Sequence, residues 1–172
     1  MATNKIKTVS LLLVLVLPLI LTTPTLAKES RKINKLIVDD YYENQMQLSL
    51  LAPQDYWVLV VVDSNLSSSH NYIRQLQQQK VDLSSAVIVL LNSNDSKEVF
   101  YKKYHTSLQP YSWVNAQGSD VLTQMKISAT PVIIGMHKDV IKWQNSGQLN
   151  SFDEVKQLSK QLKSWTNQKV GK

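Results

Sequence analysis

The chain carries the sequence YWVLVVV at residues 56–62, and this stretch predicts a strand at the centre of a sheet. Five of the six residues from 57 to 62 are β-branched or aromatic, and none is polar. That composition suits a strand covered on both faces better than an edge strand with one wet face. A polar stretch, DSNLSSSH, follows at residues 63–70 and leads into an amphipathic helical pattern that ends near Lys80.

The rest of the chain continues the alternation of apolar strands and helical patterns. A second apolar run, AVIVLL at residues 86–91, predicts a strand beside the first. Four further elements are expected: a helix from Asp95 with Glu98 in a capping pair, an extended piece at 111–114, a short helix from Gly118, and a hairpin of 132–136 and 140–143 joined by residues 137–139. This order predicts an α/β fold, in which a mixed sheet carries helices on both faces.

The final stretch of the chain predicts a helix clearly, whereas the pattern at residues 31–47 is ambiguous. Ser151 and Glu154 form a second capping pair, and an apolar stripe at spacings of three and four predicts a final helix packed on the sheet. At residues 31–47 the apolar spacing favours a helix, but LIV at 36–38 is equally consistent with the start of a strand. We expect a helix here, with the strand as the alternative.

The strand at 56–62, the polar stretch after it and the sequence SATP at 128–131 together resemble the thioredoxin fold. In that family a Cys-x-x-Cys motif follows the first central strand and faces a cis-proline loop. The resemblance assigns the two cysteine positions to Leu66 and Ser69, with Ser67 and Ser68 between them, and the proline to Pro131. The chain contains no cysteine, so it cannot carry out thiol chemistry by itself.

The degenerate motif offers little for catalysis. Leu66 has no ionisable atom, and a serine hydroxyl such as that of Ser69 needs an oriented base before it can act as a nucleophile. Neighbouring residues at a helix start seldom point at each other, so we expect Ser67, Ser68 or Ser69 to cap the helix and His70 to be an exposed helix residue.

The second part of the resemblance concerns peptide binding. In thioredoxin-like proteins the residue before the cis-proline, here Thr130, offers backbone groups to an extended peptide. The resemblance therefore implies a peptide-binding site at Thr130, Pro131 and His70, which needs no sulfur because strand addition relies on main-chain pairing. The alternative is that Pro131 only shapes the loop.

Other site chemistries are weakly represented. The three histidines include no pair at metal-ligand spacing, and Asp63 has a loop or capping role as its simplest interpretation, so we expect neither a metal nor a cofactor. The lysines are dispersed over separate helices rather than concentrated in a stripe, which argues against nucleic-acid binding.

The amino terminus has the layout of a secretory signal. Lys5 and Lys7 precede an apolar core, and Thr25-Leu26-Ala27 supplies small residues before a cleavage point. We expect residues 1–27 to be removed, leaving an extension at 28–54 and a domain at 55–172, with 17 basic against 13 acidic residues, a net charge of +4. Membrane attachment is the alternative if this segment is retained, although its uninterrupted apolar core is short for a bilayer span.

Among exported thioredoxin-like proteins, the chain is similar to periplasmic disulfide-isomerase-like proteins of conjugative transfer and type IV secretion systems. It matches them at Ser64, His70 and residues 129–131, and departs from them at Leu66 and Ser69. The resemblance implies a periplasmic or secreted, non-catalytic protein that binds an envelope partner. The alternatives are an enzyme or redox accessory subunit that acts with a cysteine-bearing partner, and a general periplasmic chaperone.

Overall fold

The computed structural model describes residues 31–33, 35–40, 42–91, 102, 112–116 and 118–168. The predicted helix starting near Asp95 and the predicted signal segment lie outside these residues. The described elements, in chain order, are β1 Ile37–Asp39, β2 Gln45–Gln47, the 3-10 turn η1 Leu48–Leu51, β3 Tyr56–Asp63, α1 Ser67–Gln78, β4 Ala86–Leu91, β5 Ser112–Ala116, α3 Gly118–Met125, β6 Val132–His137, β7 Val140–Ser146 and α4 Phe152–Thr166.

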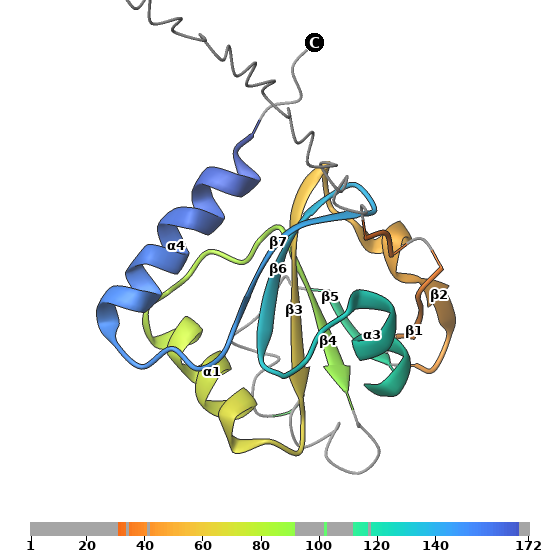
Figure 1. Cartoon of the computed structure of the whole chain (residues 1–172), viewed down its shortest axis with the longest axis horizontal. Helices are drawn as coiled ribbons and strands as arrows, with labels where there is room; N and C mark the ends of the chain where they lie inside the picture. The colour runs from red at the N-terminus through yellow and green to blue at the C-terminus, as the bar shows by residue number, and fades with distance from the viewer. Residues whose placement is uncertain are drawn as a thin grey trace, which may run out of the picture.

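One mixed sheet of seven strands runs through the molecule in the order β2-β1-β5-β4-β3-β6-β7 (Figure 1). The central strand β3 pairs in parallel with β4 and antiparallel with β6, and β4 pairs in parallel with β5. The β6–β7 hairpin forms one edge of the sheet, with β7 as the edge strand. The predicted parallel strands followed by an antiparallel hairpin are therefore confirmed.

Alternate residues of β3 belong to two separate apolar cores. Trp57, Leu59 and Val61 pack with α3 and with the residues around η1, whereas Val58 and Val60 pack with α1 and α4. All five side chains are at most 2% exposed. The absence of any polar residue from 57 to 62 thus reflects burial on both faces, as the sequence predicted.

The expected helix at residues 31–47 is wrong, because β1 and β2 form an antiparallel hairpin there. Its turn is held by the Asp40 carboxylate, whose Oδ1 accepts the backbone N–H groups of Tyr42 and Asn44 at 2.8 and 2.9 Å. Glu43 has a φ of 66°, which is incompatible with a right-handed helix. Local side-chain bonds to the backbone therefore replace the helical ones, as aspartate favours in turns.

Residues 31–39 connect both sides of the sheet. Backbone N–H groups of Ile33 and Ile141 donate to the carbonyls of Asp139 and Arg31, both at 2.9 Å, which attaches the start of this segment to β7. Its end, β1, pairs with β5 at Asp39. The segment is thus part of the sheet rather than an appendage to it.

The β6–β7 connection is shorter than predicted. His137 pairs with Val140, so two residues, Lys138 and Asp139, make the turn where three were expected. Lys138 has a φ of 54°, which fits the tight two-residue connection. The final helix begins as predicted, with the Ser151 hydroxyl accepting the Glu154 N–H at 3.2 Å.

Candidate functional site

The two halves of the predicted motif lie at the same end of the sheet. In the antiparallel pairing of β3 with β6, Val61 lies opposite Val132. The end of β3 and the start of α1 therefore face the residues that precede β6, namely Thr130 and Pro131. In Figure 1 this is the lower end of β3, where α1 begins. We call this region the motif end.

Hydrogen bonds fix the loop between β3 and α1. The Ser69 hydroxyl accepts the backbone N–H of Asp63 at 3.0 Å, and the Ser64 hydroxyl donates to the carbonyl of Leu91 at 3.2 Å. Ser69 and Ser64 are 0% and 3% exposed. The Asp63 carboxylate accepts the N–H of Asn65 at 2.8 Å, the kind of loop role predicted for this residue.

The predicted serine cap of α1 is wrong. Leu66 occupies the N-cap position, and no side chain caps the helix there. Ser69 fails as a cap because its hydroxyl turns back to the end of β3. The helix start is instead held by backbone bonds, with the N–H groups of Ser69 and His70 donating to the Leu66 carbonyl at 3.0 and 3.3 Å.

The two positions that carry cysteines in the family differ sharply in exposure. The Leu66 side chain is 43% exposed, whereas Ser69 is fully buried. The motif end thus presents an apolar side chain where the family presents a nucleophile. A buried hydroxyl that holds the backbone cannot also meet a substrate, so the Ser69 side chain acts as a structural anchor of the loop.

His70 is half-buried rather than exposed as predicted. Its Nε2 lies 3.1 Å from the carbonyl oxygen of Ser64, a contact that requires a hydrogen on Nε2. The imidazole therefore braces the β3–α1 loop. The sequence reasoning missed this because the partner carbonyl precedes the helix and becomes available only through the loop geometry.

The segment before β6 combines the buried Pro131 with main-chain groups of Thr130 that a partner could meet. The Thr130–Pro131 peptide bond is cis, as predicted. Pro131 is buried, and its carbonyl accepts the N–H of Gly147 at 3.1 Å. In contrast, the N–H and C=O of Thr130 make no hydrogen bond within the described part of the chain. Unpaired main-chain groups of this kind can pair with an incoming extended chain.

Gly147 is a contributor to this site that the sequence reasoning did not single out. Its φ of 111° lies in the region that favours glycine, and it places the N–H that holds Pro131. The Ser-Gly dipeptide at 146–147 was the available signal, because such pairs mark turns.

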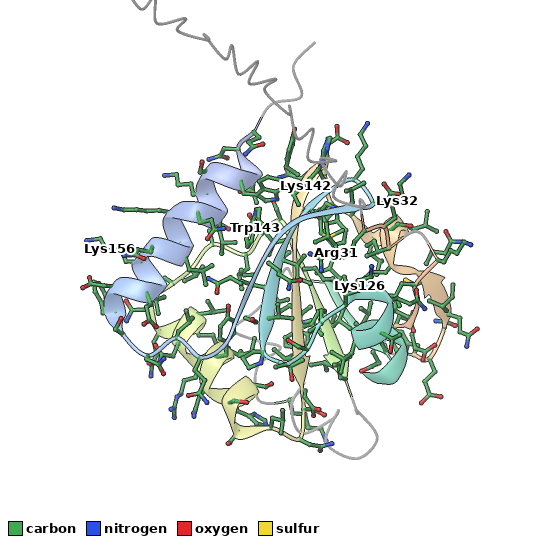
Figure 2. The ribbon with its side chains drawn as sticks, in the orientation of Figure 1. Arg31, Lys32, Lys126, Lys142, Trp143 and Lys156 are labelled. Carbon is green, nitrogen blue, oxygen red and sulfur yellow. The ribbon has the colours of Figure 1, made fainter. Side chains whose placement is uncertain are left out.

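Positive side chains lie on another part of the surface, around the start of the described chain (Figure 2). Arg31 Nη1 donates to the carbonyl of Met125 and to Oε1 of Gln144, both at 3.3 Å. Lys126 follows Met125 in sequence, and Lys142 lies on β7 near Gln144. Within the described ranges, no three acidic or histidine side chains gather as metal ligands. His105, one of the three histidines, lies outside the described residues.

Comparison of whole structures identifies the architecture. A secreted Mycobacterium tuberculosis disulfide oxidoreductase homologous to E. coli DsbE matches with a TM-score of 0.58 and 11% identity, covering 74% of this chain and 94% of its own. The MTB protein dsbF matches with a TM-score of 0.56 and 12% identity, covering 77% and 96%. The chain has a thioredoxin-like fold.

A third thioredoxin-like structure, the thioredoxin domain of a thiol-disulfide oxidoreductase from Bacteroides vulgatus, matches with a TM-score of 0.52 and 16% identity, covering 77% of this chain and 97% of its own. No protein-family model matches the sequence, and a search of curated proteins gives no significant match. At these identities the likeness is one of fold. In the described ranges, none of the helices has both the length and the apolar character needed to cross a bilayer.

Proposed function

We propose that this chain is a non-catalytic, exported thioredoxin-like protein that binds an extended segment of an envelope protein at the motif end. The observation that carries the proposal is the unpaired backbone of Thr130, next to an anchored Pro131. A partner strand that pairs with Thr130 would gain main-chain hydrogen bonds without any thiol. The signal-like segment at residues 1–27 supports export.

The character of the surrounding surface supports an apolar contact beside the paired backbone. Leu66 is 43% exposed on the α1 side, and Ala129 is exposed on the β6 side. An apolar side chain of the partner could cover Leu66 while its backbone pairs with Thr130. The absence of cysteine removes the redox step and leaves the binding step of a thioredoxin-like site.

We also propose in which envelope apparatus the partner is found. Ser64, His70 and residues 129–131 match the pattern of periplasmic proteins of conjugative transfer and type IV secretion systems. We therefore place the partner in a transfer or secretion apparatus of the envelope. Support for this part comes from the sequence resemblance alone.

The test compares two threonines that differ in location. We expect Thr130→Trp to abolish capture of the partner from an envelope extract of the native host, because the indole blocks the unpaired backbone. Thr123→Trp, at an exposed position of α3, should leave capture unchanged. Both variants should keep the free energy of unfolding within about 0.5 kcal/mol of the parent, as surface substitutions usually do.

Other outcomes separate the alternatives. Unchanged capture by a well-folded Thr130→Trp variant would move the binding site away from the motif end. Suppression of aggregation of many unrelated clients would favour a general chaperone. Turnover of a disulfide substrate only when the captured partner is present would favour a redox accessory role.

A further inference from the structure

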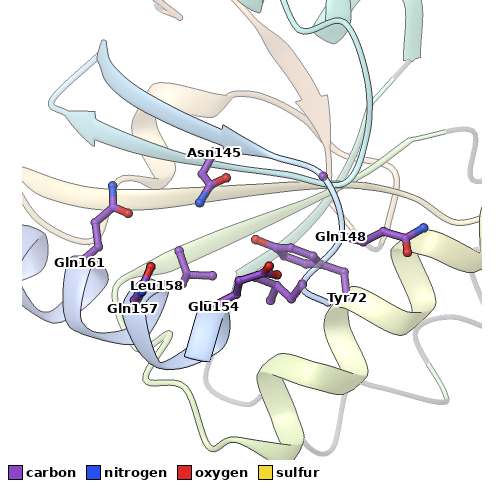
Figure 3. Close-up of a pocket in the computed structure, with 9 residues that line it drawn as sticks. Tyr72, Asn145, Gln148, Glu154, Gln157, Leu158 and Gln161 are labelled. Atoms are coloured by element: carbon purple, nitrogen blue, oxygen red, sulfur yellow. The ribbon is translucent and has the colours of Figure 1, made fainter. Parts of the chain in front are cut away.

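A small pocket lies between the end of β7, α1 and α4, separate from the motif end (Figure 3). Its volume is about 220 Å³, below the range of about 300–1,000 Å³ typical of drug-sized sites. It can therefore hold one small ring rather than an extended molecule. The residues that line it are Tyr72, Asn145, Gly147, Gln148, Leu149, Glu154, Gln157, Leu158 and Gln161.

The floor of this pocket carries the hydroxyl of Tyr72, a residue that is otherwise buried. Tyr72 is 3% exposed, and its hydroxyl makes no hydrogen bond within the described residues. Figure 3 shows the phenol reaching from α1, with its oxygen directed toward the space beside Asn145 and Leu158. Burial raises the pKa of Tyr72 above its ordinary value, so the hydroxyl stays protonated and can both donate and accept. The oxygen is not one of the buried polar atoms that lack a partner, so it reaches the open space of the pocket, where a ligand can bond to it.

The rim of the pocket carries four carboxamides from two elements and the loop between them. The side chains of Asn145, Gln148, Gln157 and Gln161 are exposed, and none makes a hydrogen bond in the described part of the chain. Each carboxamide offers an acceptor oxygen and a donor NH₂ group. Below them, Leu149 and Leu158 are buried and give the pocket an apolar wall. The lining therefore combines mixed donors and acceptors with a non-polar surface.

The charge of the lining selects a neutral ligand. Among the described residues, no lysine or arginine lines the pocket, so an anion would find no counter-charge from them. Glu154, in the first turn of α4, is the one carboxylate among the described lining residues, and its Oε2 accepts the N–H of Asn150 at 2.6 Å. Because the positive end of the helix dipole compensates this carboxylate, a cation gains little there.

We propose that this pocket binds a single neutral sugar ring. Sugar hydroxyls donate and accept at adjacent positions, as the carboxamides and the Tyr72 hydroxyl require, and the C–H face of a ring can lie on Leu149 and Leu158. The proposal is independent of peptide binding at Thr130. The pocket and the motif end share Gly147, which lines the first and holds Pro131 in the second.

The experiment is a titration of the exported protein, labelled with nitrogen-15, with D-glucose, D-galactose and N-acetyl-D-glucosamine. We expect at least one sugar to shift the side-chain NH₂ signals of Asn145, Gln157 and Gln161 in a saturable way. Sodium phosphate and L-argininamide serve as an anionic and a cationic probe and should cause no saturable shift. Absence of saturation with every sugar, or tighter binding of argininamide, would overturn the proposal.

Variants test whether the Tyr72 hydroxyl takes part in binding. Tyr72→Phe should weaken binding of the responding sugar about three- to tenfold through loss of one hydrogen bond. Tyr42→Phe, at an 81% exposed position away from the pocket, is the matched control and should bind like the parent. Equal affinity of Tyr72→Phe and the parent would contradict the assignment.

A second pair of variants keeps the proposal testable if Tyr72→Phe fails to fold. Gln161→Ala should weaken binding about threefold, whereas Gln168→Ala, just beyond the end of α4, should not. Both residues are exposed, so both variants should fold. If Gln161→Ala and Gln157→Ala, as single variants, both bind like the parent, the proposal is also overturned.

Discussion

The two ends of β3 are built in opposite ways. At the start of the strand, Tyr56 stacks on His137 at 4.4 Å between ring centroids and meets Trp165 edge-on at 5.1 Å. The indole N–H of Trp57 donates to the Lys138 carbonyl at 2.8 Å, and that of Trp165 donates to the Trp57 carbonyl at 3.0 Å. We call this region the aromatic end.

At the motif end, the described contacts are hydrogen bonds to the main chain. The side chains of Ser64, Ser69 and His70 make such bonds, and the backbone N–H and C=O of Thr130 have no partner among the described residues. In the part of the chain that the structure describes, aromatic contacts thus mark one end of β3, and main-chain groups available for pairing mark the other. Binding surfaces usually occupy the less tightly packed part of a fold in this way.

The largest expected effect lies at the aromatic end. Trp57→Ala should lower the free energy of unfolding by about 3–5 kcal/mol, because the indole is 0% exposed and fills the core that packs against α3. Leu66→Ala, at the motif end, should change it by about 0.5 kcal/mol or less. Urea denaturation followed by circular dichroism measures both. Equal losses in the two variants would remove the contrast between the ends.

An intermediate effect is expected at Gly135, which pairs with Trp143 across β6 and β7. A Cβ atom at Gly135 would collide with the Trp143 indole, so Gly135→Ala should cost about 1–3 kcal/mol. The same substitution in a Trp143→Val background should cost much less. A cost that does not depend on Trp143 would assign it to the backbone instead.

The smallest of these effects separates two neighbouring serines at the motif end. Ser69→Ala should lower the free energy of unfolding by about 1–2 kcal/mol, since it leaves the N–H of Asp63 without its acceptor. Ser67→Ala should be neutral, because its side chain is exposed and caps nothing. Thermal denaturation of the two variants distinguishes them. A larger loss for Ser67→Ala would restore the predicted capping role.

The sequence predicted the parts of the fold that depend on burial. The uninterrupted apolar runs at 56–62 and 86–91 can bury the side chains of both their faces only inside a sheet that is covered on both sides. Both runs form central strands. The hairpin at 37–47 was not predicted, since strands of three residues are too short to show alternation and its turn depends on the Asp40 carboxylate.

The candidate site was predicted in position but not in detail. The order of strands brings Leu66, Ser69 and Pro131 to one end of the sheet, as the resemblance implied. The direction of each side chain was not accessible, because the hydroxyl of Ser69 and the ring of His70 choose partners in the folded loop. The Tyr72 pocket was missed for a related reason, since its lining comes from three separate segments.

The attachment of residues 31–39 to both β7 and β5 has a consequence for the timing of folding. Synthesis proceeds from the amino end, so this segment is made before residues 112–116 and 140–141, with which it pairs. Ile33 and Leu36, each 1% exposed in the finished protein, remain without their final neighbours until then. Such contacts between distant parts of the chain slow folding. Completion of the sheet must therefore wait for nearly the whole chain.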